Sequence, residues 1–491
     1  MPKTLTIILL LASLLVSSAF VSTNVPLDHF SYDALEKLIG QGLIESAMMT
    51  TKPLSRLEMA RIIAEAIEKY QKIKEKNEII SRLIERLKSE FKDELISTGL
   101  FEETTVDSFI KPIEDPYVKF IYGRNKPNLE NLRGDVFNEN SNYRLGFASR
   151  MKLFDTAAFY LHPQFAHSSP ETLDIDLIEA YGKLNLANLE LQLGKDSLWW
   201  GPGYHGSIIL SNNPEPFKML KISNPRPIEL PWIFRSLGPF KAVWFLTELE
   251  EARAIPEAKL TALRINFKPH PTFEFGLSRA IMFGGSSRPS VDLKDYLDMW
   301  SIQPEQPGTN QLAGFDLSFL YPLEDKIPAK SIKLYADLIG EDEAGGLPAR
   351  WARLFGLQLN DILRTGRTDL RIEYANNYFS DRPDVFYTHG LYLSGYTYKG
   401  RIIGHHMGTD TRDFFIRLTH YITQDVILGL EFDREQGLSS THDQTIDQLG
   451  FDLTFFTSNS WQLKTGYRYE HSKNISRPDN HIVMLQLVFN F

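Results

Sequence analysis

From about residue 113 to the C-terminus, the chain repeats segments of roughly ten residues in which apolar and polar side chains alternate. Residues 259–267 and 446–455 show this alternation clearly. A period of two places successive side chains on opposite faces of a β-strand, so one face meets an apolar medium and the other a polar one. The pattern predicts either a sandwich, whose apolar faces meet each other, or a membrane barrel, whose apolar face meets lipid.

The C-terminal segment, residues 481–491, favours the barrel. Its alternate positions share one apolar face, and the last residue is aromatic. This end resembles the C-terminal signature of bacterial outer-membrane barrels. The residues on that face are Val483, Leu485, Leu487, Phe489 and Phe491.

The spacing of the strands supports the same interpretation. About seventeen strands are evident, whereas closed bacterial barrels have an even number. Short and long connections alternate, as turns and external loops do in such barrels. That alternation breaks only between residues 196 and 236, so one irregular strand there would give about eighteen strands and close the wall. Short connections are expected near 363–368, 422–424 and 458–460, and long ones near 341–350, 378–411, 435–446 and 472–480.

The N-terminus has the pattern of a secretory signal peptide. Lys3 precedes an apolar run from Leu5 to Val16, and small residues follow up to Ala19. We expect a signal peptide over 1–19, a helical periplasmic module over 20–105 and an outer-membrane β-barrel over 106–491. The apolar run is too short for a membrane anchor.

Composition excludes several functions. The chain has no cysteine, which rules out disulfides and thiolate zinc sites. Its net charge of −9, without a Lys/Arg-rich block, argues against nucleic-acid binding.

The region before the strands reads as helical. Ser55 and Glu58 form a capping box, a shorter helix is expected over 32–39, and a charged helix over about 75–95. The region resembles an S-layer homology module, which implies that residues 26–105 contact peptidoglycan or a wall-linked polymer. The alternative is a helical cap that packs under the barrel. The matching segments are 27–30, 32–38, 42–44 and 52–60.

The segment 196–236 is too rich in proline to form a continuous ladder, so we expect irregular structure inside or above the barrel. Trp199 and Trp200 stand beside a Gly-Pro-Gly sequence, and Asn212 and Asn213 follow. Indole rings suit the apolar faces of sugars, and amides suit their hydroxyls. The alternative is that the Trp residues are packing or interface residues and that the Asn residues hold turns.

Residues 199–203, 206–213 and Pro216, with the later stretch 396–408, resemble the Wzi-type capsule assembly family. The resemblance implies an eighteen-stranded barrel with a helical periplasmic part, in contact with outer-membrane lipids. Members bind capsular polysaccharide, act as lectins rather than catalysts, and help hold the polymer on the bacterial surface. Exopolysaccharide is an alternative ligand.

Basic residues in or beside the irregular segments, Arg235 among them, would meet an acidic polymer or, alternatively, pair with carboxylates of the protein. The expected polysaccharide contacts are Trp199, Trp200, Tyr204, Ser211, Asn212, Asn213, Arg226, Lys399 and Arg401.

Catalytic and metal motifs are weak. His405 and His406 lie in a Gly-rich loop without carboxylates at helical spacing, and Ser207 lacks the G-x-S-x-G elbow. We therefore expect no enzyme, cofactor or metal. The competing functions are a porin with an open lumen and an envelope tether that links the outer membrane to peptidoglycan.

Overall fold

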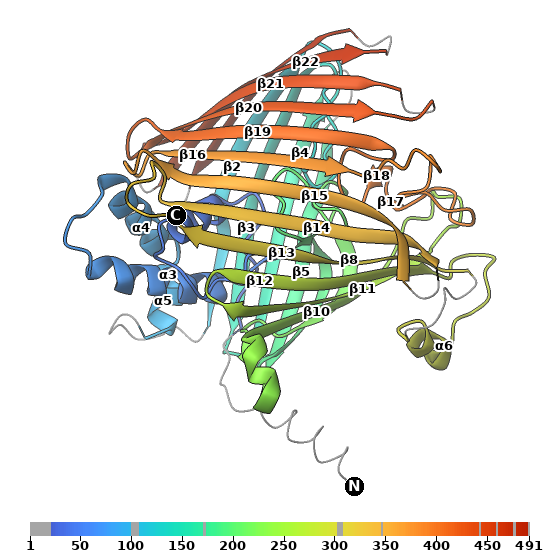
Figure 1. Ribbon diagram of the computed structural model, residues 1–491, viewed down its shortest axis with the longest axis horizontal. Coiled ribbons are helices and arrows are strands. Elements are labelled where there is room, and N and C mark those ends of the chain that lie inside the picture. Colours follow the sequence, from blue (N-terminus) through green and yellow to red (C-terminus); the bar gives the residue numbers. More distant parts are fainter. Residues whose placement is uncertain are drawn as a thin grey trace.

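The computed structural model describes residues 21–99, 108–169, 173–301, 308–344, 347–440, 443–457, 460–474 and 478–489. The predicted signal peptide lies outside these residues. The described chain forms a closed antiparallel barrel with a group of helices at one end (Figure 1). The barrel closes because the first wall strand, β2, pairs with the last, β23.

The wall contains eighteen strands within the described part of the chain, as the sequence predicted. Each strand pairs with its neighbours in the sequence. The strands are β2 (Phe109–Gly123), β3 (Asn140–Leu153), β4 (Ala157–Ser168), β5 (Asp174–Leu186), β6 (Leu189–Asp196), β8 (Phe217–Ser223), β10 (Pro239–Glu248), β11 (Lys259–His270), β12 (Phe273–Phe283), β13 (Asn310–Pro322), β14 (Ser331–Ala344), β15 (Leu347–Ile362), β16 (Thr368–Asn376), β19 (Thr411–Tyr421), β20 (Val426–Gly437), β21 (Thr445–Phe456), β22 (Trp461–Lys473) and β23 (Asn480–Phe489).

The side chains of the wall distinguish a barrel from a sandwich. Outward-facing Leu145, Leu449 and Leu485 are exposed, whereas inward-facing Arg264 and Asp316 are buried. An apolar outer face around a polar interior is the arrangement of a barrel in lipid.

Strand β8 is the hidden strand that the break in loop alternation predicted. It pairs with β6 on one side and β10 on the other. The two-residue strand β9 (Ile228–Glu229) pairs with the first two residues of β10, Pro239 and Phe240. The 3₁₀ helix η1 (Trp232–Leu237) lies between β9 and β10 in the sequence.

The prediction of a long connection at 341–350 was wrong. Strand β14 extends to Ala344 and β15 begins at Leu347, so the wall continues where acidic and glycine residues suggested a loop.

The N-terminal helices are α2 (Ser31–Gly40), α3 (Arg56–Gln71), α4 (Glu78–Glu90) and α5 (Lys92–Ser97). The Ser55 hydroxyl accepts a hydrogen bond from the Glu58 N–H at 3.2 Å, which caps α3 as the sequence predicted. The single helix expected over 75–95 is divided at Phe91 into α4 and α5. We call residues 21–99 the helical module.

Figure 1 shows α3, α4 and α5 at one end of the barrel and α6 (Leu293–Asp298) at the opposite end, which we call the outer end. Here too lies the small hairpin of β17 (Thr397–Tyr398) and β18 (Arg401–Ile402). None of the described helices is both long and apolar enough to cross a membrane.

Ion pairs bind the helical module to the barrel wall. Lys37 of α2 lies 2.8 Å from Asp369, and Glu36 lies 3.0 Å from Lys333 and 3.4 Å from Arg371. Burial alone would raise the pKa of Glu36, but these two cations lower it to about 2. Glu36 and Lys37 belong to the S-layer-like pattern, and both face the barrel.

A second set of contacts lies at the turn between β19 and β20. The Arg86 guanidinium lies 2.6 Å from Asp425 and 3.9 Å from the centroid of the Phe456 ring. These contacts support the interpretation of the helices as a cap packed on the barrel.

Candidate functional site

Two segments that leave the wall fill the outer half of the lumen. We call residues 197–216 the plug and residues 377–410 the long loop. The plug begins with β7 (Trp199–Trp200), which pairs with β1 (Thr51–Lys52) of the helical module. The plug therefore meets the helical module inside the barrel.

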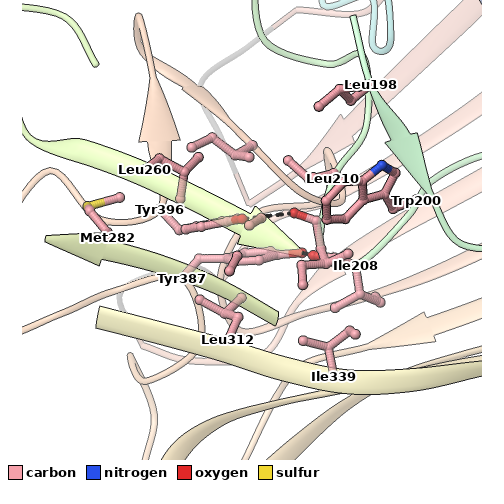
Figure 2. Close-up of a cluster of buried hydrophobic side chains, with 14 of the residues drawn as sticks. Leu198, Trp200, Ile208, Leu210, Leu260, Met282, Leu312, Ile339, Tyr387 and Tyr396 are labelled. Atoms are coloured by element: carbon pink, nitrogen blue, oxygen red, sulfur yellow. Dashed lines mark hydrogen bonds between the residues drawn. The ribbon is translucent and has the colours of Figure 1, made fainter. Parts of the chain in front are cut away.

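An apolar cluster joins the plug, the long loop and the wall (Figure 2). Trp200 is completely buried in this cluster. The Tyr387 hydroxyl donates to the Ile208 carbonyl at 2.5 Å, and the Tyr396 hydroxyl donates to the Ile209 carbonyl at 3.1 Å. The cluster includes Leu198, Trp200, Ile208 and Leu210 of the plug, Tyr387 and Tyr396 of the long loop, and Leu260, Met282, Leu312 and Ile339 of the wall.

Carboxylates of the wall hold the plug backbone. Glu373 accepts hydrogen bonds from the N–H groups of Tyr204 and His205 at 2.7 and 2.9 Å. Asp337 accepts one from the Ile208 N–H at 2.9 Å. Charge-assisted bonds of this kind fix an irregular segment that has no ladder of its own.

Most of the aromatic and amide residues predicted to contact polysaccharide hold the plug in place. The Trp199 indole N–H donates to the Gly203 carbonyl at 3.2 Å. The Ser211 hydroxyl donates to the Gly404 carbonyl at 2.6 Å, and the Asn213 amide donates to the Ile402 carbonyl at 3.0 Å. These contacts favour the packing interpretation, and polysaccharide contact by these residues stays a prediction.

Tyr204 and Asn212 lie deeper in the barrel. With Trp199 they line a cavity of about 300 Å³ between the plug and the helical module. The Arg371 guanidinium lies 4.1 Å from the centroid of the Tyr204 ring. The Asn212 carbonyl accepts a hydrogen bond from the Arg133 N–H at 2.8 Å.

The predicted basic contacts do not form one group. Arg401 donates to the carbonyls of Leu129 and Asp135, which belong to the loop between β2 and β3. The Arg226 N–H donates to the Asn188 side chain at 3.1 Å, next to the turn between β5 and β6. Arg226 therefore lies toward the helical module, away from the outer end. Arg235, in η1, is mostly exposed and lies 3.3 Å from Glu229.

Lys399 occupies a different position, at a hollow near the outer end of the wall. Strand β5 pairs with β6 only over residues 180–186, because β6 ends at Asp196 where the chain turns into the plug. The outer part of β5 thus has no β6 partner, and an open hollow of about 600 Å³ lies beside it.

Three amines meet at this hollow, which we call the lysine hollow, and one of them belongs to the predicted contact Lys399. Lys399 and Lys195 lie 2.7 and 3.4 Å from Glu215, and Lys218 is exposed at the same place. Sequence reasoning missed Lys195 and Lys218. Alternation along β6 and β8 would have placed them on the outer face, but not beside Lys399. The lining residues are Asp176, Leu177, Ala180, Leu193, Gly194, Lys195, Lys218, Met219, Leu220 and Lys399.

Residues 123–481 match the model of the family described as capsule assembly protein Wzi. The chain belongs to the Wzi family. The resemblance noted from residues 199–216 and 396–408 is thereby confirmed.

A relative of this Wzi-family chain is a Klebsiella pneumoniae protein described as an uncharacterized 55.8 kDa protein in the cps region. The two are 27% identical over 363 residues, which cover 71% of this chain and 64% of the relative. The match therefore spans slightly less than two thirds of that protein.

A solved structure with the same fold is Escherichia coli Wzi, described as an outer-membrane protein involved in group 1 capsule assembly and a carbohydrate-binding β-barrel. The TM-score is 0.75 at 22% identity, and the match covers 95% of this chain and 99% of the other. Such coverage includes most of the helical module, so the helices belong to the shared fold. The S-layer assignment gains no support from this match.

Proposed function

We propose that this chain is an outer-membrane surface protein that binds capsular or another extracellular polysaccharide and helps attach or assemble it, without catalysis. The supporting observation is a lumen filled by the plug and the long loop, combined with a basic hollow open at the outer end. A polymer cannot pass through packed side chains, so its contacts must lie on the surface. Family membership and the carbohydrate binding of E. coli Wzi agree with this proposal.

The lysine hollow suits an acidic glycan. Lys195, Lys218 and Lys399 supply three positive charges, whereas Glu215 and Asp176 supply two negative ones. Its leucine residues offer apolar contact to the C–H face of a sugar ring, and the amines would pair with uronate carboxylates. Each exposed ion contact contributes about 0.5 kcal/mol. A long polymer with repeated units would gain strength from many such contacts on neighbouring copies.

Replacing Lys195, Lys218 and Lys399 together by Gln should lower the affinity for a purified acidic polysaccharide about tenfold, because three weak ion contacts sum to about 1.5 kcal/mol. Biolayer interferometry on the detergent-solubilised protein at two salt concentrations measures this change, and the wild-type affinity should fall with salt.

The matched control replaces Lys72, Lys74 and Lys76, three exposed lysines of the helical module, by Gln. This variant carries the same change in charge and should keep the wild-type affinity. Equal affinity of all three proteins would contradict the proposal. The proposal would also be contradicted if the variant at Lys195, Lys218 and Lys399 lost binding to lipopolysaccharide vesicles but bound the acidic polysaccharide as the wild type does.

Two alternatives remain without a favouring observation in the described structure. A porin requires an open lumen, whereas the plug and the long loop pack against the wall; planar-bilayer conductance tests this point. Wall-polymer contact by residues 26–105 stays a prediction, and cosedimentation of the whole protein with purified sacculi tests it.

A further inference from the structure

A group of histidine and carboxylate side chains lies buried inside the barrel, away from the lysine hollow. His205 comes from the plug, His406 from the long loop, Asp413 from β19 and Asp433 from β20. Their side chains are only 8, 5, 3 and 4% exposed. The plug on one side, and the long loop with the adjoining hairpin of β19 and β20 on the other, thus bring two imidazoles and two carboxylates together.

The distances between their ligand atoms suit a small ion. His406 Nε2 lies 3.1 Å from Glu435 Oε1 and 3.3 Å from Asp413 Oδ2. His205 Nε2 lies 3.5 Å from Asp433 Oδ2 and 4.0 Å from Asp413 Oδ2. Ligand atoms around a tetrahedral ion with bonds of about 2.0–2.1 Å lie about 3.3 Å apart. The observed separations are within a few tenths of an ångström of that value, apart from the longest.

These atoms lack the hydrogen bonds that burial normally requires. His205 Nε2, both ring nitrogens of His406, Asp413 Oδ2 and both carboxylate oxygens of Asp433 have no hydrogen-bond partner among the described residues. Buried polar atoms are rarely left in this state. One ligand atom from each of His205, His406 and Asp433 lies within 4.8 Å of the other two.

The surroundings hold the imidazoles in place. The His205 ring stacks on Phe415 with centroids 3.9 Å apart, and its backbone N–H is bonded to Glu373. His405 stacks on His406, but its Nδ1 accepts a hydrogen bond from the Met407 N–H, so we leave it out of the ligand set.

The carboxylates of Asp413 and Asp433 are both buried beside the imidazoles. Buried negative charges favour a cation next to them, and a divalent ion between neutral imidazoles would supply that charge.

We propose that His205, His406 and Asp433 form a binding site for a divalent transition-metal ion of the zinc type, with Asp413 beside it. Two imidazoles and a carboxylate are ligands that zinc takes, and the Asp413 carboxylate adds a second negative charge next to the ion. The ion would link the plug and the long loop to the wall strand β20. This departs from the sequence expectation of no metal, which considered only neighbouring residues.

The test uses the purified full-length protein, produced with zinc and dialysed against metal-free buffer. Elemental analysis should find about one zinc per chain, and replacement by Co²⁺ should give the intense visible bands of tetrahedral cobalt. His406→Gln and Asp433→Asn should each lower the affinity for zinc about 100-fold or more. His405→Gln, at the neighbouring histidine, and His270→Gln, at an exposed one, should retain the ion.

Folding of each variant is checked by its migration on unheated gels. If the ligand variants do not fold, the zinc content and the cobalt spectrum of the wild-type protein still test the proposal. Wild-type protein with less than about a tenth of an ion per chain and no cobalt bands would overturn the proposal. Equal zinc content in the wild type, the ligand variants and the two control variants would also overturn it, because the ion would then be adventitious.

Discussion

Excising the plug and the long loop together should expose a thiol placed inside the barrel to reagents added from outside. The wild-type chain has no cysteine, so Ala352→Cys, at a completely buried wall position in the apolar cluster, gives a single reporter. With both segments present, an impermeant maleimide should react with this thiol on the order of 100-fold more slowly than after their excision, since local opening must come first.

The register of the wall permits this excision. Asp196 pairs with Phe217, and Asn376 pairs with Arg412, so each segment leaves and re-enters the wall at adjacent residues. An Asn-Gly turn can therefore replace residues 197–216 and 377–411. Replacing the turn 323–330 in the same way, between the paired Pro322 and Ser331, is the matched control and should leave the reporter protected. A reporter that stays protected in a folded double-excision variant would show that the lumen is closed by other residues.

The second large effect concerns Arg264, which is 1% exposed and joins the wall to the helical module. It lies 2.6 Å from Asp316 and donates to the hydroxyls of Thr50 and Thr51 at 2.7 and 2.6 Å. Arg264→Ala leaves the Asp316 carboxylate buried without its cation. We expect the free energy of unfolding to fall by about 3–5 kcal/mol, the usual cost of breaking a buried pair.

Urea unfolding in detergent micelles measures this loss. Arg434→Ala breaks a more exposed pair with Asp447 and should cost less than about 1 kcal/mol. The double variant Arg264→Met and Asp316→Leu should recover much of the loss, because it removes the unpaired charge. A loss for Arg264→Ala no larger than that for Arg434→Ala would contradict the interpretation.

The fold could be predicted from the sequence because every wall strand in lipid must alternate outward apolar side chains with inward polar ones. Alternation identified the strands, and the need for closure located β8 inside a proline-rich segment. The same reasoning failed at 341–350, where acidic residues at the end of β14 and Pro348 at the start of β15 interrupt the apolar alternation although both strands continue. A strand that rises out of the membrane has no apolar face to reveal it.

The candidate sites were harder to predict. Lys399 was expected to contact the ligand, but its neighbours Lys195 and Lys218 come from two wall strands on either side of the plug. His406 belongs to a histidine pair that is visible in the sequence, whereas Asp413 and Asp433 belong to no motif. Which side chains from separate strands and loops meet in space depends on the strand register and on the path of the irregular segments. Neither of these can be recognised from a short stretch of sequence.

The short pairing of β1 with β7 has a mechanical consequence. Thr51 and Lys52 are bonded to the plug, and the Ser211 N–H of the plug donates to the Ile403 carbonyl of the long loop, so backbone hydrogen bonds connect the helical module with the long loop without passing through the wall. A force applied to the plug or the long loop would therefore be shared with the helices at the opposite end of the barrel.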